Sequence, residues 1–212
     1  MKVLIVGSGS LSDSRLLADR CKWADLVIAA DGGALHLAKS GLVPHILLGD
    51  FDSIPASVLE KLTGRKDVEV IRHPVRKDYT DMELAVDLAA DRGATELVML
   101  GACGSRLDHT AGNIFLLHKL LDKGIEGHIE DDKNQVYMIK DSLKINKQGN
   151  RKVSLLPLTS SVEGITTKGL SYALRDDTLF FGINRGISNE FEEETAVITL
   201  KKGVLLVFIS ED

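Results

Sequence analysis

The sequence has few cysteines and no long apolar run. Cys21 and Cys103 are far apart, and neither has a second cysteine or a histidine pair at metal-binding spacing. This usage argues against a disulfide framework and against a zinc site. No run of about 18 apolar residues could cross a membrane, and the apolar run at the N-terminus is too short for a secretory signal. We therefore expect reduced thiols, no membrane partner and a cytoplasmic protein.

The chain also lacks a block of basic residues. Its net charge is −5, and its acidic and basic side chains are interspersed, so we expect no nucleic-acid partner. A Walker A motif is missing as well, which excludes a P-loop enzyme. The 212 residues, 44% of them hydrophobic, suit one large globular domain or two small ones.

Two patterns divide the chain. Apolar runs alternate with helical patterns up to residue 127, which is typical of an α/β domain with a mostly parallel sheet. From residue 128 onwards, short β-rich runs separated by turns predict an all-β sandwich. The sequence therefore predicts an N-terminal domain at 1–127 and a C-terminal domain at 128–212. The strands expected in the two domains are 3–6, 26–30, 46–48, 68–71 and 97–100, then 136–139, 153–156, 165–167, 172–174, 179–181, 196–200 and 204–209.

Two carboxylates follow the run 46–48 at alternate positions. Asp50 and Asp52 come after a glycine, and Ser53 with Pro55 favours the start of a helix. Ligands bind at the carboxyl ends of strands in open α/β sheets, and side chains two apart in an extended segment face the same side. Neighbouring carboxylates repel each other unless a cation lies between them, and their oxygens suit Mg²⁺ with substrate phosphates. We therefore expect a magnesium site, with a solvated turn as the structural alternative.

A third carboxylate, Asp31, ends the run 26–30 and precedes two glycines. Gly32 and Gly33 lack side chains, so their backbone amides can approach a ligand oxygen as in phosphate-binding turns. An ordinary helix entry would use the same residues. The pattern is therefore compatible either with phosphate binding or with a plain turn.

A charged loop carries Lys77 and Asp78 and leads into the next helix. Thr80 and Glu83 form a capping box there, and Asp81 in the first turn is stabilised by the helix dipole whether or not it binds a ligand. No such structural reason accounts for Lys77 and Asp78. They are therefore candidate functional residues.

The turn after the run 97–100 is rich in glycine and contains Arg106. Its planar guanidinium could clamp a phosphate, and Asp108 is the N-cap candidate of the following helix. His109 and Asn113 could be ordinary residues of that helix. This turn resembles the earlier ones in lying between a strand and a helix.

Taken together, these residues form the set that magnesium-dependent phosphoryl-type transfer requires. Carboxylates hold Mg²⁺, while cations and backbone amides neutralise the phosphate oxygens. The residues that make up the set are Asp31, Asp50, Asp52, Asp78, Asp81, Asp108, Lys77, Arg106, Gly32 and Gly33.

Six blocks of the chain are similar, in order, to the signature blocks of the thiamine pyrophosphokinase family. The blocks are Asp31-Gly32-Gly33, Gly49-Asp50-Phe51-Asp52-Ser53, Lys77-Asp78-x-Thr80-Asp81, Arg106-Leu107-Asp108-His109 with Asn113, Gly169-Leu170-Ser171-Tyr172-x-Leu174 and Gly186-Ile187-Ser188-Asn189-Glu190-Phe191. The resemblance spans nearly the whole chain. It implies an α/β nucleotide domain with a β-sandwich, and Mg²⁺-dependent transfer of pyrophosphate from ATP to thiamine with release of AMP. It also implies a homodimer with active sites at the interface.

The resemblance assigns roles position by position. It places Asp50, Asp52 and Asp81 at the metal, and adds Asp78, Arg106 and Asp108 as further catalytic residues. For ATP it implies Asp31, Gly32, Gly33, Lys77, Arg106, His109 and Asn113. For thiamine it implies stacking by Tyr172 and hydrogen bonds from Ser188 and Asn189. The general base for the thiamine hydroxyl stays unassigned. Two positions depart from the family pattern, since Ala102 replaces an expected glycine and Tyr172 a frequent tryptophan.

Two other interpretations remain at this point. A dinucleotide-binding oxidoreductase would explain Gly7-x-Gly9 after the first strand and Asp31 at the end of the second, but Ser12 stands in place of the third glycine. A non-catalytic nucleotide-sensing module would fit the fold but leaves Lys77 and the metal-type carboxylates without a role.

Overall fold

The apolar runs at 3–6, 26–30, 46–48 and 97–100 form strands that are buried on both faces. In the computed structural model, which describes residues 1–211, the side chains of Val3, Leu4, Ile5 and Val6 have no exposed surface. Such continuous burial is expected of parallel strands covered by helices on both sides. The chain divides into unit 1 (Met1–Asp132) and unit 2 (Lys133–Asp212).

Unit 1 contains six strands in the order β4-β3-β2-β1-β5-β6, and all neighbours among them are parallel. The strands are β1 (Lys2–Val6), β2 (Leu26–Ala30), β3 (Ile46–Gly49), β4 (Glu69–Arg72), β5 (Glu96–Leu100) and β6 (Glu126–Glu130). Because β2 and β3 are neighbours and run in the same direction, the turns that follow them lie at the same edge of the sheet. Asp31, Asp50 and Asp52 lie in these two turns.

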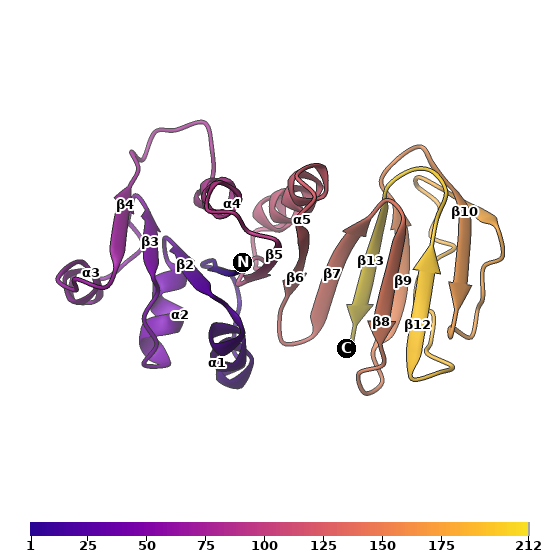
Figure 1. Cartoon of the computed structure of the whole chain (residues 1–212), viewed down its shortest axis with the longest axis horizontal. Helices are drawn as coiled ribbons and strands as arrows, with labels where there is room; N and C mark the ends of the chain where they lie inside the picture. The colour runs from indigo at the N-terminus through magenta and orange to yellow at the C-terminus, as the bar shows by residue number, and fades with distance from the viewer. Residues whose placement is uncertain (212) are drawn as a thin grey trace. The chain divides into compact units, whose positions relative to one another are not determined.

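Five helices connect the strands of unit 1. They are α1 (Ser14–Trp23), α2 (Gly33–Lys39), α3 (Ala56–Thr63), α4 (Asp81–Asp91) and α5 (Leu107–Asp122). Figure 1 shows α1 and α2 below the strands, and α4 and α5 above them. No helix in the described part of the chain is both long enough and apolar enough to cross a membrane.

Unit 2 is an antiparallel β-sandwich. Its strands are β7 (Asn134–Ile139), β8 (Ser142–Asn146), β9 (Lys152–Pro157), β10 (Ser161–Lys168), β11 (Asp177–Phe180), β12 (Thr195–Thr199) and β13 (Leu205–Ser210). Strand β13 pairs with β7 and β9, while β11, β10, β12 and β8 form a four-stranded sheet. One apolar cluster with Val153, Ile165, Ile198 and Val207 fills the sandwich. The predicted fold class, α/β followed by a β-sandwich, is confirmed.

Several elements differ from the sequence interpretation. Strands β6 and β8 were not expected, because each has few buried apolar residues. Residues 172–174 do not form a strand; hydrogen bonds between Thr167 and Leu174 hold this segment in an irregular conformation. Helix α5 begins at Leu107 with Arg106 as its N-cap, so the prediction that Asp108 is the N-cap was wrong.

Candidate functional site

Three carboxylates meet at the carboxyl ends of β2 and β3. Asp31 follows β2, and Asp50 and Asp52 follow β3; one oxygen from each lies within 4.8 Å of the others. We call these three residues the carboxylate cluster. Three convergent carboxylates supply the hard oxygen ligands that Mg²⁺ prefers.

The backbone of the β3 turn brings Asp50 and Asp52 together by a route that the sequence did not suggest. Phe51, between them, has a φ of 70°, in the left-handed region, so the segment is not extended as predicted. The Asp52 N–H instead donates a hydrogen bond to Asp50 Oδ1 at 3.1 Å. Phe51 is almost fully buried and anchors the turn to the core of unit 1. A tight turn, and not a pleat, therefore places the two carboxylates on one side.

Asp31 is oriented by a residue from the second turn. The Ser53 hydroxyl donates to Asp31 Oδ2 at 2.5 Å, so Ser53 joins the two turns and does not cap α3 as its position suggested. Asp31 has a φ of 46°, which is uncommon for a residue with a side chain. Its buried Oδ1 has no hydrogen-bond partner among the described residues. A buried carboxylate oxygen left free beside two other carboxylates fits a cation ligand.

The electrostatics of the cluster point the same way. The charge of Asp50, followed by partial desolvation and the charge of Asp31, raises the pKa of Asp52 above its ordinary value. Like charges have this effect when no cation separates them. A bound divalent cation would remove the repulsion.

Lys77 and Asp81 border the cluster. The Lys77 ammonium lies 2.9 Å from Asp81 Oδ1 and 3.6 Å from Asp50 Oδ2, and its side chain is 12% exposed. Burial lowers the pKa of Lys77, but Asp81 and Asp50 outweigh this effect and raise it, so the ammonium keeps its charge at neutral pH. Thr80 caps α4 by accepting the Glu83 N–H, which is one half of the predicted capping box, while the Glu83 carboxylate pairs with Lys119. Asp78 lies exposed in the same loop.

The glycines after Asp31 have packing roles. A Cβ atom on Gly33 would lie 1.8 Å from the backbone oxygen of Val6, and one on Gly32 would lie 2.8 Å from Ser53 Oγ. Gly33 therefore lets α2 approach β1 closely. This contact explains the glycine without a ligand, which is the alternative that the sequence left open.

The β5–α5 turn and the first half of α5 carry the remaining candidates of unit 1. Arg106 donates two hydrogen bonds to Asp108, at 3.2 and 2.6 Å, and this pairing lowers the pKa of Asp108 to about 2. Both side chains are well exposed, as is His109. Asn113 is buried and donates to the backbone oxygen of Ala102 at 2.7 Å, so it fixes the turn from within.

A second turn packs directly against this one, backbone to backbone. Gly9 N–H donates to the Gly101 oxygen at 2.7 Å. A Cβ on Gly7 would lie 2.7 Å from that same oxygen, and one on Gly9 would lie 2.3 Å from the Cys103 oxygen. The Gly7-x-Gly9 pair therefore serves contact between two turns. This removes the main support for a dinucleotide-binding site.

In unit 2, Asn189 holds the backbone of Tyr172. Asn189 Oδ1 accepts the Tyr172 N–H at 3.0 Å, and Asn189 Nδ2 donates to the Tyr172 oxygen at 2.9 Å. Asn189 is buried, whereas the Tyr172 side chain is 72% exposed. The structure thus presents the aromatic ring to solvent and uses the asparagine to support it.

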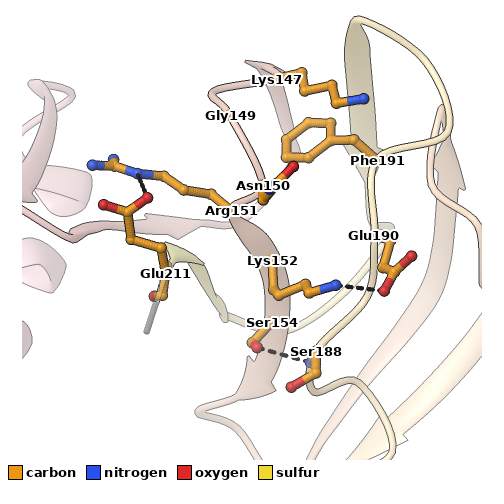
Figure 2. A pocket seen from close by; sticks show the side chains of 11 residues that line it. Lys147, Gly149, Asn150, Arg151, Lys152, Ser154, Ser188, Glu190, Phe191 and Glu211 are labelled. Carbon is orange, nitrogen blue, oxygen red and sulfur yellow. Dashed lines mark hydrogen bonds and ion pairs between the residues drawn. The ribbon is translucent and has the colours of Figure 1, made fainter.

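A polar pocket of about 620 Å³ in unit 2 contains Ser188. Figure 2 shows Ser188 beside Ser154, whose hydroxyl accepts the Ser188 N–H at 3.0 Å. Lys152 and Glu190 form an ion pair on the same wall, and Phe191 also lines the pocket. Sequence reasoning named Ser188 but not Lys152 or Ser154. Their alternate positions on β9 were the signal available, because side chains two apart face the same side.

Two family models match the chain. The model described as "Thiamin pyrophosphokinase, catalytic domain" covers residues 17–129, and "Thiamin pyrophosphokinase, vitamin B1 binding domain" covers residues 140–205. A thiamine pyrophosphokinase of Bacillus subtilis (strain 168) is 28% identical over 217 residues, which span 100% of both chains. Thiamin pyrophosphokinase 1 of Caenorhabditis elegans is 27% identical over 197 residues, covering 87% of this chain and 78% of the relative.

Solved structures agree with these matches. The thiamine pyrophosphokinase of Bacillus subtilis superposes with a TM-score of 0.89 at 28% identity, over 100% of both chains. That of Geobacillus thermodenitrificans gives a TM-score of 0.87 at 30% identity, over 100% of this chain and 98% of the other. The yeast thiamin pyrophosphokinase shares the fold, with a TM-score of 0.82 at 18% identity over 99% and 86% of the two chains.

Proposed function

The chain belongs to the thiamine pyrophosphokinase family, and on that premise we propose that it transfers pyrophosphate from ATP to thiamine with Mg²⁺. In this reaction the hydroxyl oxygen of thiamine bonds to the β-phosphorus of ATP. The bond from the β-phosphorus to the oxygen shared with the α-phosphate breaks and the hydroxyl group loses its proton, so the products are thiamine diphosphate, AMP and a proton. The observation that carries the proposal is the convergence of Asp31, Asp50 and Asp52 at one sheet edge.

The carboxylate cluster fits a magnesium ion. Its three residues offer oxygen atoms only, one of them a buried oxygen without a partner. We propose Asp50 and Asp52 as metal ligands. We add Asp31 to the residues that the resemblance assigned to the metal, because its carboxylate lies in the same cluster. Asp81, which the family resemblance also assigns to the metal, stays a candidate ligand, although its Oδ1 is paired with Lys77. When bound, Mg²⁺ would neutralise charge on the phosphate oxygens and help to position them for attack.

Residues in and near the turns that follow the strands of unit 1 are proposed to hold ATP. Lys77 is charged and close enough to the cluster to reach phosphates bound there. Arg106 is exposed and offers a planar fork of donors, although Asp108 shares it in this structure. Asp78 and His109 are exposed and accessible, while Asn113 and Gly33 support the two turns from within.

Unit 2 is proposed to bind thiamine. The exposed Tyr172 ring can stack on a flat, cationic ligand, and Ser188 lines the polar pocket nearby in sequence. Asn189 already uses both amide atoms on the Tyr172 backbone, so we assign it the positioning of Tyr172. We also propose a homodimer in which one chain provides the cluster and its partner provides Tyr172, because the cluster lies in unit 1 and Tyr172 lies in unit 2, where no metal-type cluster is found among the described residues.

Exposed apolar side chains of unit 2 also support a homodimer. Phe180, Phe181 and Ile183 are each more than half exposed. Large patches of exposed apolar side chains often mark sites of protein–protein interaction. The cytoplasmic location stays a prediction.

One assay tests the proposed function against a nucleotide-sensing module. Purified protein is incubated with ATP, Mg²⁺ and thiamine, and AMP and thiamine diphosphate are quantified. We expect both products in equal amounts, and neither when thiamine is omitted or Mg²⁺ is chelated. Binding of ATP without any AMP would contradict an enzyme and favour the sensing module.

A further inference from the structure

Lys77 holds an unusual place for a lysine side chain. Its ammonium group faces two carboxylates from different elements, Asp50 after β3 and Asp81 at the start of α4. The three side chains are only 12%, 13% and 20% exposed, respectively. Lys77 therefore belongs to a partly buried ion-pair network at the carboxylate cluster, whereas most lysine ammonium groups lie in solvent.

Both oxygens of Asp50 are engaged within the protein. Oδ1 accepts the N–H of Asp52, and Oδ2 lies 3.6 Å from Lys77 Nζ. In the described part of the chain, no ion pair is formed by Asp31 or Asp52. A cation that enters the cluster and uses Asp50 must therefore compete with the ammonium of Lys77, whereas Asp31 and Asp52 present no such competitor.

We propose that Lys77 is an internal counter-ion, which a divalent cation must displace from Asp50, so that metal binds weakly alone and firmly with the nucleotide. The displaced ammonium finds a new partner in the polyphosphate, which arrives together with the metal. This inference rests on the proposed function, since it takes Mg²⁺ and ATP as the ligands. It adds that the order of binding is set by a residue of the chain itself.

The test is a titration of the nucleotide-free protein with Mn²⁺, followed by electron paramagnetic resonance of the free ion. A unit charge a few ångströms from a metal position changes the affinity by about tenfold or more. Lys77→Met should therefore bind Mn²⁺ about tenfold more tightly than the wild type. Lys77→Gln keeps a polar side chain at the position and should show the same gain. Lys77→Arg keeps the charge and should stay near the wild type.

With α,β-methylene ATP present, the difference in Mn²⁺ affinity between Lys77→Met and the wild type should reverse. This analogue cannot be cleaved between the α- and β-phosphates, so it reports binding alone. Lys77→Met should then bind the Mn²⁺ complex about tenfold more weakly than the wild type, because the polyphosphate has lost its ammonium partner. The proposal requires both the gain without nucleotide and the loss with it.

Lys119 offers a matched control. Its ammonium also bridges two carboxylates, Glu83 at 3.0 Å and Asp87 at 2.7 Å, and both belong to α4. Lys119→Met changes the net charge by the same amount, outside the cluster. It should leave both Mn²⁺ titrations unchanged, and folding of every variant is checked by circular dichroism.

Unchanged or weaker Mn²⁺ binding by nucleotide-free Lys77→Met and Lys77→Gln would overturn the proposal. A gain that Lys119→Met shares would do the same, because the effect would then be one of net charge. The nucleotide-free titration uses neither substrate. A wild-type protein that makes no AMP from ATP and thiamine therefore refutes the proposed function separately, whatever the Mn²⁺ result.

Discussion

Asp52 is the most exposed carboxylate of the cluster. A substitution there disturbs little packing, so its effects on stability and on activity can be measured separately. The charge of Asp50, with desolvation and the charge of Asp31, raises the pKa of Asp52 from 3.8. An acid whose pKa is higher in the folded state is less stable ionised there than in the unfolded chain. Ionised Asp52 therefore costs stability above the raised pKa, and this cost disappears as the pH falls below 3.8.

We therefore predict opposite effects of Asp52→Asn on activity and stability at neutral pH. Removing one metal ligand should lower AMP formation by about a hundredfold or more, while the melting temperature stays equal or rises slightly. Asp50→Asn should lose activity to the same extent, since it removes a second ligand. Steady-state AMP release and thermal unfolding of the metal-free proteins check both effects. Near-normal Mg²⁺-dependent activity of either variant would remove the metal-site interpretation.

Asn189 provides a second prediction at the residue scale. Asn189→Ala removes the two hydrogen bonds that fix the Tyr172 backbone. The tyrosine ring is still present in this variant, but it should no longer be held in its position. The KM for thiamine should rise about tenfold, with the KM for ATP unchanged. Leaving the part-buried N–H and C=O of Tyr172 without these partners should also lower the free energy of unfolding by about 1–3 kcal/mol.

Substitutions of Tyr172 itself give the controls for this prediction. Tyr172→Phe keeps the ring and should leave the KM for thiamine near the wild type, whereas Tyr172→Ala should raise it as Asn189→Ala does. If Tyr172→Ala has a normal KM for thiamine, neither residue serves that substrate.

Local motifs made several of these residues recognisable from the sequence. Asp50 and Asp52 stand out because both the strand end and the spacing of the carboxylates are local features. The hydrogen bond from Ser53 to Asp31 joins residues 22 positions apart and could not be inferred from spacing. The left-handed φ of Phe51 was also hidden, since nothing in a phenylalanine favours that conformation.

At the scale of elements, the entry into α2 depends on Gly33. A Cβ there would lie 1.8 Å from the Val6 oxygen, a backbone atom of a fully buried strand that cannot move away. We predict that Gly33→Ala lowers the free energy of unfolding by about 2 kcal/mol or more. Urea unfolding measures this change, and the KM values for ATP and thiamine should move little in the fraction that stays folded.

Gly112 is the matched control for that substitution. It lies within α5, and a Cβ on it would meet nothing within 4 Å. Gly112→Ala should therefore stabilise the protein by about 0.5–1 kcal/mol, because alanine has the higher helix propensity. If Gly33→Ala is as stable as the wild type and only ATP binding suffers, Gly33 is a phosphate-binding residue and its packing role is minor.

Periodicity explains which elements were predicted. Strands β1, β2, β3 and β5 are mostly apolar runs, and the helices of unit 1 show apolar stripes, so these elements were recognised. Strand β8 has a single buried residue, Ile145, so its alternation of apolar and polar residues was too weak to predict a strand. The segment 172–174 was predicted to be a strand, yet contacts with Asn189 and Thr167 decide its conformation. Tertiary hydrogen bonds of this kind override local propensity.

At the scale of the whole molecule, the proposed homodimer requires each active site to combine residues of two chains. The carboxylate cluster belongs to unit 1, and the exposed Tyr172 belongs to unit 2. In a dimer with two-fold symmetry, whatever one chain donates to its partner it also receives, so two equivalent composite sites form. A cation over an aromatic ring gains roughly 0.5–2 kcal/mol, so the proposed stacking of Tyr172 on cationic thiamine would have a measurable effect on binding.

This arrangement predicts that two inactive variants restore activity when they assemble together. Asp50→Ala and Tyr172→Ala chains, co-expressed in equal amounts, form mixed dimers in about half of the cases. In each mixed dimer one site carries both defects and the other is intact, so about a quarter of wild-type sites return. AMP release at limiting thiamine should therefore exceed the average of the two separate variants. Asp50→Ala co-expressed with Asp81→Ala is the control, because both residues lie in unit 1 and every mixed site stays defective. Activity of the first pair no higher than that of the control would place Tyr172 and the cluster in the same chain's site.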